Sequence, residues 1–133
     1  MDCIFCKIVA GELPATIVRS DERTLAFMDI APGTRGHCLV IPRTHSADLT
    51  EVSPEDLAAC ALAAQDLTRR ALDGLDADGV NLINSCRAAA WQTVFHFHVH
   101  VIPRYANDGL VLPWTPTPAD PAELQAAAAA LRG

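Results

Sequence analysis

Residues 95–104 read FHFHVHVIPR, and this stretch constrains the fold more than any other part of the chain. His96, His98 and His100 occupy every second position of it. Side chains alternate between the two faces of a β-strand, so we expect a strand over residues 93–102 that carries the three imidazoles on one face. The residues expected on the opposite face are all apolar and need a packing partner: Phe95, Phe97, Val99 and Val101.

The packing partner we expect is a helix over residues 53–75. Ser53 can cap its N-terminus, Pro54 suits the first helical position, and Gly74 can end it. Its apolar residues recur at helical spacing and form one stripe: Leu57, Cys60, Ala61, Ala64, Leu67, Ala71 and Leu72. This stripe is expected to cover the apolar face of the histidine strand.

The remaining elements are predicted from short apolar segments bounded by Gly or Pro. They are a helical turn within residues 2–10, strands over residues 24–29, 37–41 and 80–84, and a terminal helix over residues 122–131. The pattern predicts an α+β fold, with an antiparallel sheet and one long helix packed on one face.

Charge and length limit the classes of partner. The chain has 133 residues and a net charge of −6, with no cluster of Lys and Arg, so we expect neither nucleic acid nor a membrane surface as a partner. A small phosphate ligand stays compatible with this charge. The N-terminal residues do not resemble a secretory signal, and five cysteines are an odd number. We therefore expect a cytoplasmic protein with reduced thiols, with or without a bound metal.

The row of imidazoles is compatible with three roles. It can be an ordinary polar sheet face, or a structural zinc site that uses all three rings. It can also be a catalytic or ligand-binding row, because imidazole titrates near neutral pH. The third role is favoured, since Thr, Lys or Glu would solvate a polar face equally well.

Three segments resemble the histidine triad (HIT) family. FHFHVHVIPR, preceded by Gln92-Thr93-Val94, resembles the signature of the family. CIFCKIVAGELPA at 3–15 and FMDIAPGTRGHCLVIPRTH at 27–45 are similar to segments of its nucleotide-binding branch. The resemblance implies a HIT-like fold, a single histidine triad domain over residues 1–133, and a homodimer.

The same resemblance implies a reaction. Members of this branch bind purine nucleotides and cleave at the α-phosphate. The resemblance implies that His98 is the nucleophile that forms a nucleotidyl-histidine, that His100 donates to a phosphate oxygen, and that His37 orients the row. Neutral imidazole, with a reference pKa of ~6.5, is a suitable nucleophile at pH 7. The implied enzyme is a phosphoramidase-like nucleotidyl hydrolase or transferase. The alternatives are a dinucleoside polyphosphate hydrolase and a non-catalytic module that senses nucleotides.

The resemblance to the family also implies which residues bind the substrate. Asn84, Gln92 and Thr93 match positions near the phosphate or the leaving group. Asp29 matches the acid that binds the ribose hydroxyls, although it can also act as a cap of the following turn. The residues implied for the base pocket, which can equally be plain core, are Phe5, Ile8, Phe27 and Ile30.

Cys3 and Cys6 form a Cys-x-x-Cys pair, which alone suits a redox pair or two unrelated small residues. In part of the family such a pair joins two histidines around zinc, and the matching residues here are His45 and His96. The resemblance thus implies a closed, structural Zn²⁺ site with two thiolates and two imidazoles. An empty reduced site and a disulfide are the alternatives.

One loop departs from the family pattern. Residues 84–93 read NSCRAAAWQT and contain no glycine, whereas the family loop is glycine-rich. Glycine allows backbone to approach a phosphate closely. We therefore expect Trp91, directly before Gln92, to narrow the leaving-group side of the pocket or to stack on a neighbouring group.

Overall fold

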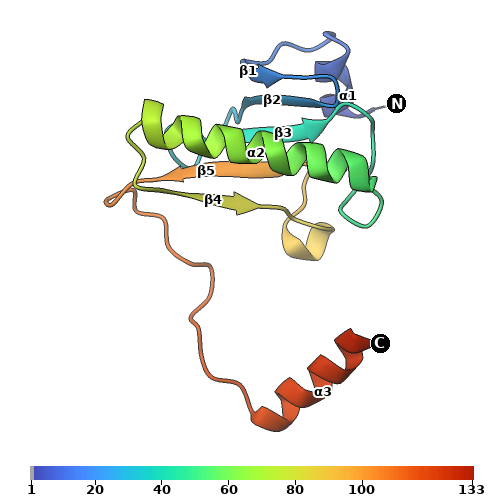
Figure 1. The fold of residues 1–133 in the computed structure, drawn as a ribbon, viewed down its shortest axis with the longest axis vertical. Coiled ribbons are helices and arrows are strands. Elements are labelled where there is room, and N and C mark those ends of the chain that lie inside the picture. The colour runs from blue at the N-terminus through green and yellow to red at the C-terminus, as the bar shows by residue number, and fades with distance from the viewer. Residues whose placement is uncertain (1) are drawn as a thin grey trace.

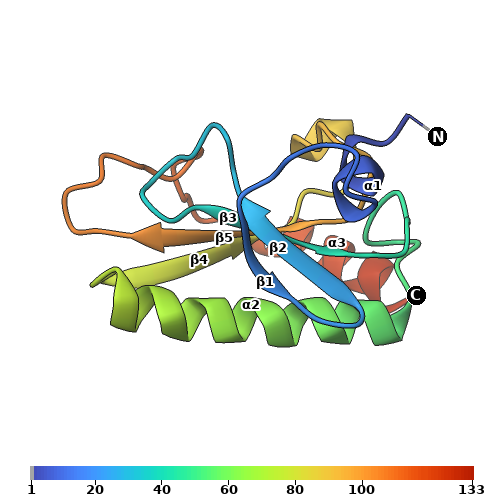
Figure 2. The same ribbon diagram turned by 90° about the horizontal axis from the view of Figure 1, so that it is seen from above.

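The computed structural model describes residues 2–133. Within these residues, five strands form one antiparallel sheet in the order β1-β2-β3-β5-β4. The strands are β1 (Ile17–Ser20), β2 (Thr24–Met28), β3 (Cys38–Pro42), β4 (Gly79–Ile83) and β5 (Val99–Arg104). The α-helices are α1 (Ile4–Val9), α2 (Pro54–Gly74) and α3 (Pro121–Arg132). Helix α2 crosses one face of the sheet and α1 lies on the other (Figures 1 and 2), which confirms the predicted α+β class.

The central strands of the sheet are buried on both faces. In β2, Ala26 belongs to the core beneath α2, whereas Leu25 and Phe27 belong to a second core on the opposite face. Strand β3 divides its side chains in the same way. Helix α1 covers the second core through Phe5, whose ring meets Phe27 edge-on with a centroid distance of 5.3 Å. Burial on two faces explains why these strands read as continuous apolar runs.

The ends of α2 are as predicted. The Ser53 hydroxyl accepts a hydrogen bond from the Asp56 N–H at 3.1 Å, and the helix ends at Gly74. Its buried apolar residues are small except for one leucine: Cys60, Ala63, Ala64, Leu67 and Ala71. A helix face of this kind can lie close to the sheet.

The predicted stripe is wrong at both ends and at Ala61, which is exposed. Leu57 and Leu72 are 38% and 42% exposed. Leu72 follows Ala71 by one residue, which rotates it about 100° away from the sheet. In the first turn, Asp56 takes the buried position and its carboxylate accepts from the Arg23 guanidinium at 2.9 Å.

The predicted histidine strand begins later than expected. Strand β5 starts at Val99, so the assignment of residues 93–98 to the strand was wrong. The neighbouring strand β3 ends at Pro42, which has no N–H with which to continue the ladder. The Phe97 N–H instead donates to the Ser46 carbonyl at 2.7 Å.

The alternation of faces holds only from Phe97 onward. Phe97 and Val101 are both 1% exposed and pack in the core beneath α2, as predicted. Phe95 is 51% exposed, and its predicted burial is wrong. It lies where the chain bends before the strand, so no partner strand sets its direction.

The predicted short elements are present with small shifts of boundary, and one strand was missed. Strand β1 has only four residues and is partly exposed, so its sequence carries a weak pattern. Helix α3 follows an extended segment, and none of its residues is buried; Figure 1 shows it apart from the sheet. Across residues 2–133, every helix is too short or too polar to cross a bilayer.

Candidate functional site

A cavity of about 400 Å³ opens on the face of the sheet opposite α2. Its walls come from α1, the loop that follows α1, β2, β3, β5 and the segment before β5. Eight of the predicted site residues line this one cavity: Phe5, Ile8, Phe27, Asp29, Ile30, Thr93, His98 and His100. The wall therefore combines apolar side chains with a carboxylate, a hydroxyl and two imidazoles.

The ring of His98 is held in one tautomer. Its Nδ1–H donates to the main-chain carbonyl of His96 at 2.7 Å, which leaves Nε2 with a free lone pair. Asn84 donates from Nδ2 to the carbonyl of His98 at 2.9 Å, just beyond the last residue of β4. Burial lowers the pKa of His98, although the bond to His96 opposes this shift. The ring is therefore neutral at pH 7.

Asn84 is therefore placed beside the main chain of His98 and does not line the cavity. Its side chain takes the place of a ladder bond where β4 has ended. This position fixes the segment that carries the imidazole.

His37 and His100 form a second chain of hydrogen bonds. The Gly33 N–H donates to Nδ1 of His37 at 2.9 Å, so the proton of His37 is on Nε2. This Nε2–H donates to Nδ1 of His100 at 2.9 Å. The proton of His100 is consequently on its own Nε2, which is free to donate to a ligand. His37 thus contacts His100, rather than His98 as expected.

Asp29 uses its two carboxylate oxygens differently. Oδ1 accepts from the Ala31 N–H at 2.8 Å, which is the turn cap that the sequence allowed. Oδ2 lies 3.5 Å from Nε2 of His37 and 4.0 Å from Nδ1 of His100. The cap and a second role in the cavity are therefore compatible. A metal ion does not suit this trio, because the nearest His37 nitrogen carries a proton.

We expect the free energy of unfolding to fall as the pH is lowered from about 6.5 toward 4. Burial, reinforced by His98 and His37, lowers the pKa of His100 from 6.5 to about 4, and burial lowers the pKa values of His37 and His98 as well. The unfolded chain binds these protons first. The stabilisation is thus complete above the unfolded pKa and is lost as the pH falls toward the folded pKa.

The share of His100 in this loss is on the order of 2–3 kcal/mol. Urea unfolding of His100→Asn should therefore show a flatter dependence on pH than the wild type. The same slope in both proteins would contradict the assignment of the acid sensitivity to this buried ring.

Gln92 is 4% exposed, and its amide joins three loop segments. Nε2 donates to the carbonyls of Ala47 at 2.7 Å and Val94 at 3.1 Å, while Oε1 accepts from the Arg87 N–H at 2.7 Å. Its polar atoms are thus engaged within the protein. The residue supports the loop beside the cavity rather than lining it.

Two residues of the glycine-free loop have a positive φ angle, a backbone conformation that usually favours glycine. Arg87 and Trp91 have φ angles of 75° and 76°, on either side of the 3₁₀ turn Ala88–Ala90. Trp91 is 66% exposed. Trp91 is not among the described residues that line the cavity. The structure of the single chain therefore does not show the expected narrowing of the pocket by this side chain.

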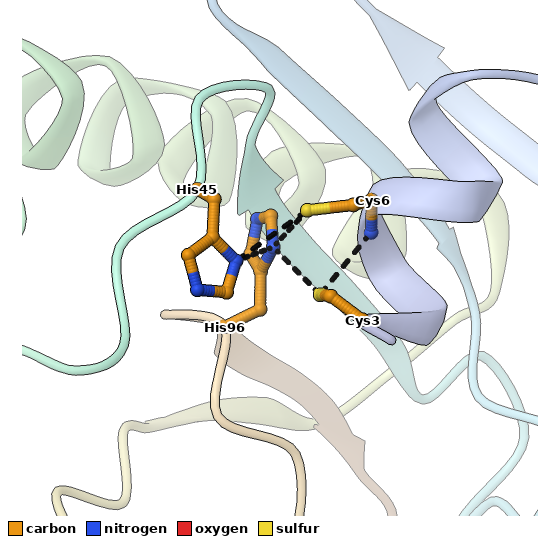
Figure 3. Close-up of side chains that lie close together, drawn as sticks. All are labelled: Cys3, Cys6, His45 and His96. Carbon is orange, nitrogen blue, oxygen red and sulfur yellow. Dashed lines mark hydrogen bonds between the residues drawn. The ribbon is translucent and has the colours of Figure 1, made fainter. Parts of the chain in front are cut away.

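Four further predicted residues meet at one point. Cys3, Cys6, His45 and His96 each place a ligand atom within 4.8 Å of the others (Figure 3). Cys3 caps α1 and Cys6 lies in its first turn, whereas the histidines come from the loop after β3 and the segment before β5. The cluster therefore joins three segments that are distant in sequence.

The spacing of the four atoms suits a tetrahedral metal ion. Nδ1 of His96 lies 3.3 Å from Sγ of Cys3, 3.5 Å from Sγ of Cys6 and 3.3 Å from Nδ1 of His45. Metal–ligand bonds of 2.0–2.3 Å at tetrahedral angles separate ligand atoms by about 3.3–3.8 Å. His96 Nε2–H donates to the Pro42 carbonyl at 2.8 Å, so its lone pair on Nδ1 faces the cluster.

Several residues of the site could not be identified from the sequence pattern. Leu13 and Pro14, in the loop after α1, line the cavity, and so do Met28 and Leu39. Gly33 acts through its main-chain N–H. The positions of these residues beside the imidazoles depend on long-range packing.

Comparison with known proteins places these features in a family. Residues 10–107 match the HIT domain. The adenosine 5′-monophosphoramidase hnt1 of Schizosaccharomyces pombe is 36% identical over 127 residues, which cover 95% of this chain and 92% of that protein.

Two solved structures are also similar. A HIT family protein from Bacillus subtilis is 38% identical, with a TM-score of 0.91 and coverage of 99% of this chain and 96% of that one. A Zn-bound histidine triad family protein from Mycobacterium smegmatis is 46% identical, with a TM-score of 0.81 and coverage of 99% and 96%. The chain thus belongs to the HIT, or histidine triad, family.

Proposed function

We propose that this protein is a nucleotidyl hydrolase or transferase that cleaves purine nucleoside monophosphate conjugates at the α-phosphate, with phosphoramidates as its preferred substrates. The observation that carries the proposal is the free Nε2 lone pair of the neutral His98 ring in the wall of the cavity. The activity named for the fission yeast relative supports this choice of substrate.

In this proposal the apolar part of the cavity holds the base, between side chains such as Phe5 and Phe27. Oδ2 of Asp29 accepts hydrogen bonds from the ribose hydroxyls, since Oδ1 is already engaged by the turn. The α-phosphate then lies against His98 and His100. Thr93 lines the same cavity and can donate its hydroxyl to the phosphate or the leaving group.

The chemistry proceeds by covalent catalysis. Nε2 of His98 attacks phosphorus, a P–N bond forms, and the bond from phosphorus to the leaving amine breaks as the amine takes up a proton from solvent. His100 donates from Nε2 to a phosphate oxygen as negative charge builds, and His37 holds that tautomer. Water then attacks the nucleotidyl-histidine and gives a proton to solvent. The P–N bond breaks, the nucleoside monophosphate is released, and the electron pair returns to His98.

An assay with adenosine 5′-phosphoramidate tests this proposal. AMP and ammonia are expected as products, at a higher kcat/KM than for a diadenosine polyphosphate. Faster cleavage of the polyphosphate would move the protein to the alternative hydrolase class. Saturable nucleotide binding with no product from either substrate would instead favour a sensing module.

Selectivity for ribose is expected to depend on Asp29. Hydrogen bonds to a charged acceptor contribute about 1.5–3 kcal/mol, so the wild type should prefer the ribonucleotide over its 2′-deoxy analogue by about 10–100-fold in kcat/KM. Asp29→Asn keeps an oxygen for the turn cap but removes the charge. The preference should then fall to near unity. A full preference in the variant would show that another group selects the ribose.

The metal site is proposed to hold Zn²⁺ through Cys3, Cys6, His45 and His96. Two thiolates and two imidazoles are a donor set that zinc accepts, and a site with four protein ligands leaves no open position for substrate. When bound, the ion supplies a cross-link between α1 and the segment before β5. The Zn-bound relative from Mycobacterium smegmatis supports the metal identity.

A homodimer is proposed as the working assembly. Strand β4 lies at one edge of the sheet, and its Leu82 and Ile83 are 52% and 41% exposed. An exposed apolar edge strand is a surface that proteins usually cover. Sedimentation at micromolar concentration is expected to give twice the mass of the chain. A mass of one chain would remove the proposal.

A further inference from the structure

A second cavity, of about 360 Å³, lies between the C-terminal half of α2 and the sheet, on the opposite side of the sheet from His98. Strand residues such as Val18 and Val101 form its floor, and Ala71 and Gly74 of α2 form part of its roof. A Cβ placed on Gly74 would meet no atom within 4 Å. This part of the roof is therefore thin, because neither Ala71 nor Gly74 carries a side chain longer than a methyl group.

The charges that border this cavity have one sign. Among the described residues that line it, Arg35 and Arg70 are charged and none is acidic, although the chain carries a net charge of −6. Arg70 pairs with Asp66 at 2.9 Å and its side chain stays 58% exposed. Arg35 is also exposed, and no hydrogen bond or ion pair of its guanidinium is found within residues 2–133. An apolar interior thus meets two cations at its surface.

We propose that this cavity binds a small single-chain amphiphile with a carboxylate head, of the medium-chain fatty acid type. The alkyl chain would fill the space beneath Ala71, and the carboxylate would lie between Arg35 and Arg70. The volume falls within the ~300–1,000 Å³ that small-molecule sites occupy. The two guanidinium groups select an acid over an alcohol or an amine of the same length.

Met28 provides a direct reporter for this ligand. It lines both this cavity and the cavity that contains His98, at the end of β2. The chain has two methionines, so a protein labelled with ¹³C at the methionine methyl groups gives two signals, and Met28→Leu assigns them. The readout involves no nucleotide chemistry. Because Met28 also borders the cavity that contains His98, only a shift that the Arg35, Arg70 and Ala71 variants remove counts as binding beneath α2.

Titration of the labelled protein with decanoate, below its micelle concentration, is expected to shift the Met28 signal saturably. From hexanoate to decanoate the affinity should rise by up to about fourfold per methylene, because each added CH₂ is buried. Decanol should bind about tenfold more weakly than decanoate, since it forms no ion pairs with the arginines.

Two sets of variants test the location. Arg35→Ala combined with Arg70→Ala should lower the affinity for decanoate about tenfold and leave the affinity for decanol unchanged. These side chains are exposed, so the fold should persist. Ala71→Leu fills the space and should abolish binding of both probes. The proposal is overturned if decanoate gives no saturable shift, or if the arginine variant binds decanoate as tightly as the wild type does. It is also overturned if dilution of the protein alone reproduces the shift, because a second copy of the chain would then occupy the cavity.

Discussion

Replacement of His98 by alanine is expected to lower kcat/KM for AMP release from adenosine 5′-phosphoramidate by about 10⁴-fold. The change removes the nitrogen that attacks phosphorus, and neighbouring imidazoles are poorly placed to replace it. His96 directs its lone pair at the cysteines, and Nδ1 of His100 already accepts from His37. Product formation can be followed by chromatography under single-turnover conditions.

A matched control lies in the same segment. Phe95 is three residues upstream of His98, is 51% exposed, and is not among the residues that line the cavity. Phe95→Ala should keep kcat/KM within about twofold of the wild type, because surface substitutions rarely perturb a site. Both variants should bind AMP with similar affinity. Wild-type turnover by His98→Ala would remove the proposed nucleophile.

Removal of zinc is expected to lower the melting temperature by about 10–20 °C. The four ligands join the cap of α1, the loop after β3 and the segment before β5. We expect the free energy of unfolding to fall by about 3–5 kcal/mol, which is a fraction of the apparent binding free energy of about 10–16 kcal/mol at structural zinc sites. In a domain of this size, that loss corresponds to the stated shift in melting temperature. Differential scanning fluorimetry with and without a strong chelator measures the effect.

Two variants separate the metal site from other cysteine effects. His45→Ala should melt at the temperature of the chelated wild type and should not respond further to chelator. Cys86→Ser changes a cysteine outside the cluster and should keep the full response. Elemental analysis first establishes that the wild-type protein contains zinc. If the chelator then left its melting temperature unchanged, a structural role of the metal would be contradicted.

Zinc affinity should also decrease as the pH falls. Burial, with added effects of Cys3, raises the pKa of Cys6 from 9.0 to about 11 in the metal-free protein. The thiol is therefore protonated at pH 7, and the ion must displace its proton. Each displaced proton lowers the apparent affinity by up to about tenfold per unit of decreasing pH. Competition with a zinc indicator between pH 6 and 8 gives this slope.

The sequence predicted the parts of the fold that depend on local periodicity. The face of Phe97 and Val101 and the N-cap of α2 by Ser53 follow from spacing and residue type, and the structure contains both; of the three histidines, only His100 lies in the strand. The α+β class followed from the order of these elements. The four-residue strand β1 was missed because so short a segment carries little pattern.

The other details depend on register and long-range contacts. Pro42 was visible in the sequence, but its effect on the histidine strand required the knowledge that β3 and β5 are neighbours in the sheet. Neither the bond from Gly33 to His37 nor the bond from Asn84 to the carbonyl of His98 has a local signal. The first of these bonds, together with the bond from Nδ1 of His98 to the carbonyl of His96, decides which nitrogen of each ring is free. The tautomers, and thus the roles of the imidazoles, could be derived only from the folded chain.

The most direct measurement is ³¹P NMR of the covalent intermediate, trapped with a slowly hydrolysed adenosine substrate on protein labelled with ¹⁵N-histidine. A phosphorus signal coupled to one ¹⁵N nucleus, with the AMP mass located on His98 by peptide mass spectrometry and with Nδ1 still protonated, is the predicted result. An adduct on another residue, or product formation with no phosphorus–nitrogen bond at any time, would contradict the assignment of this imidazole as the nucleophile.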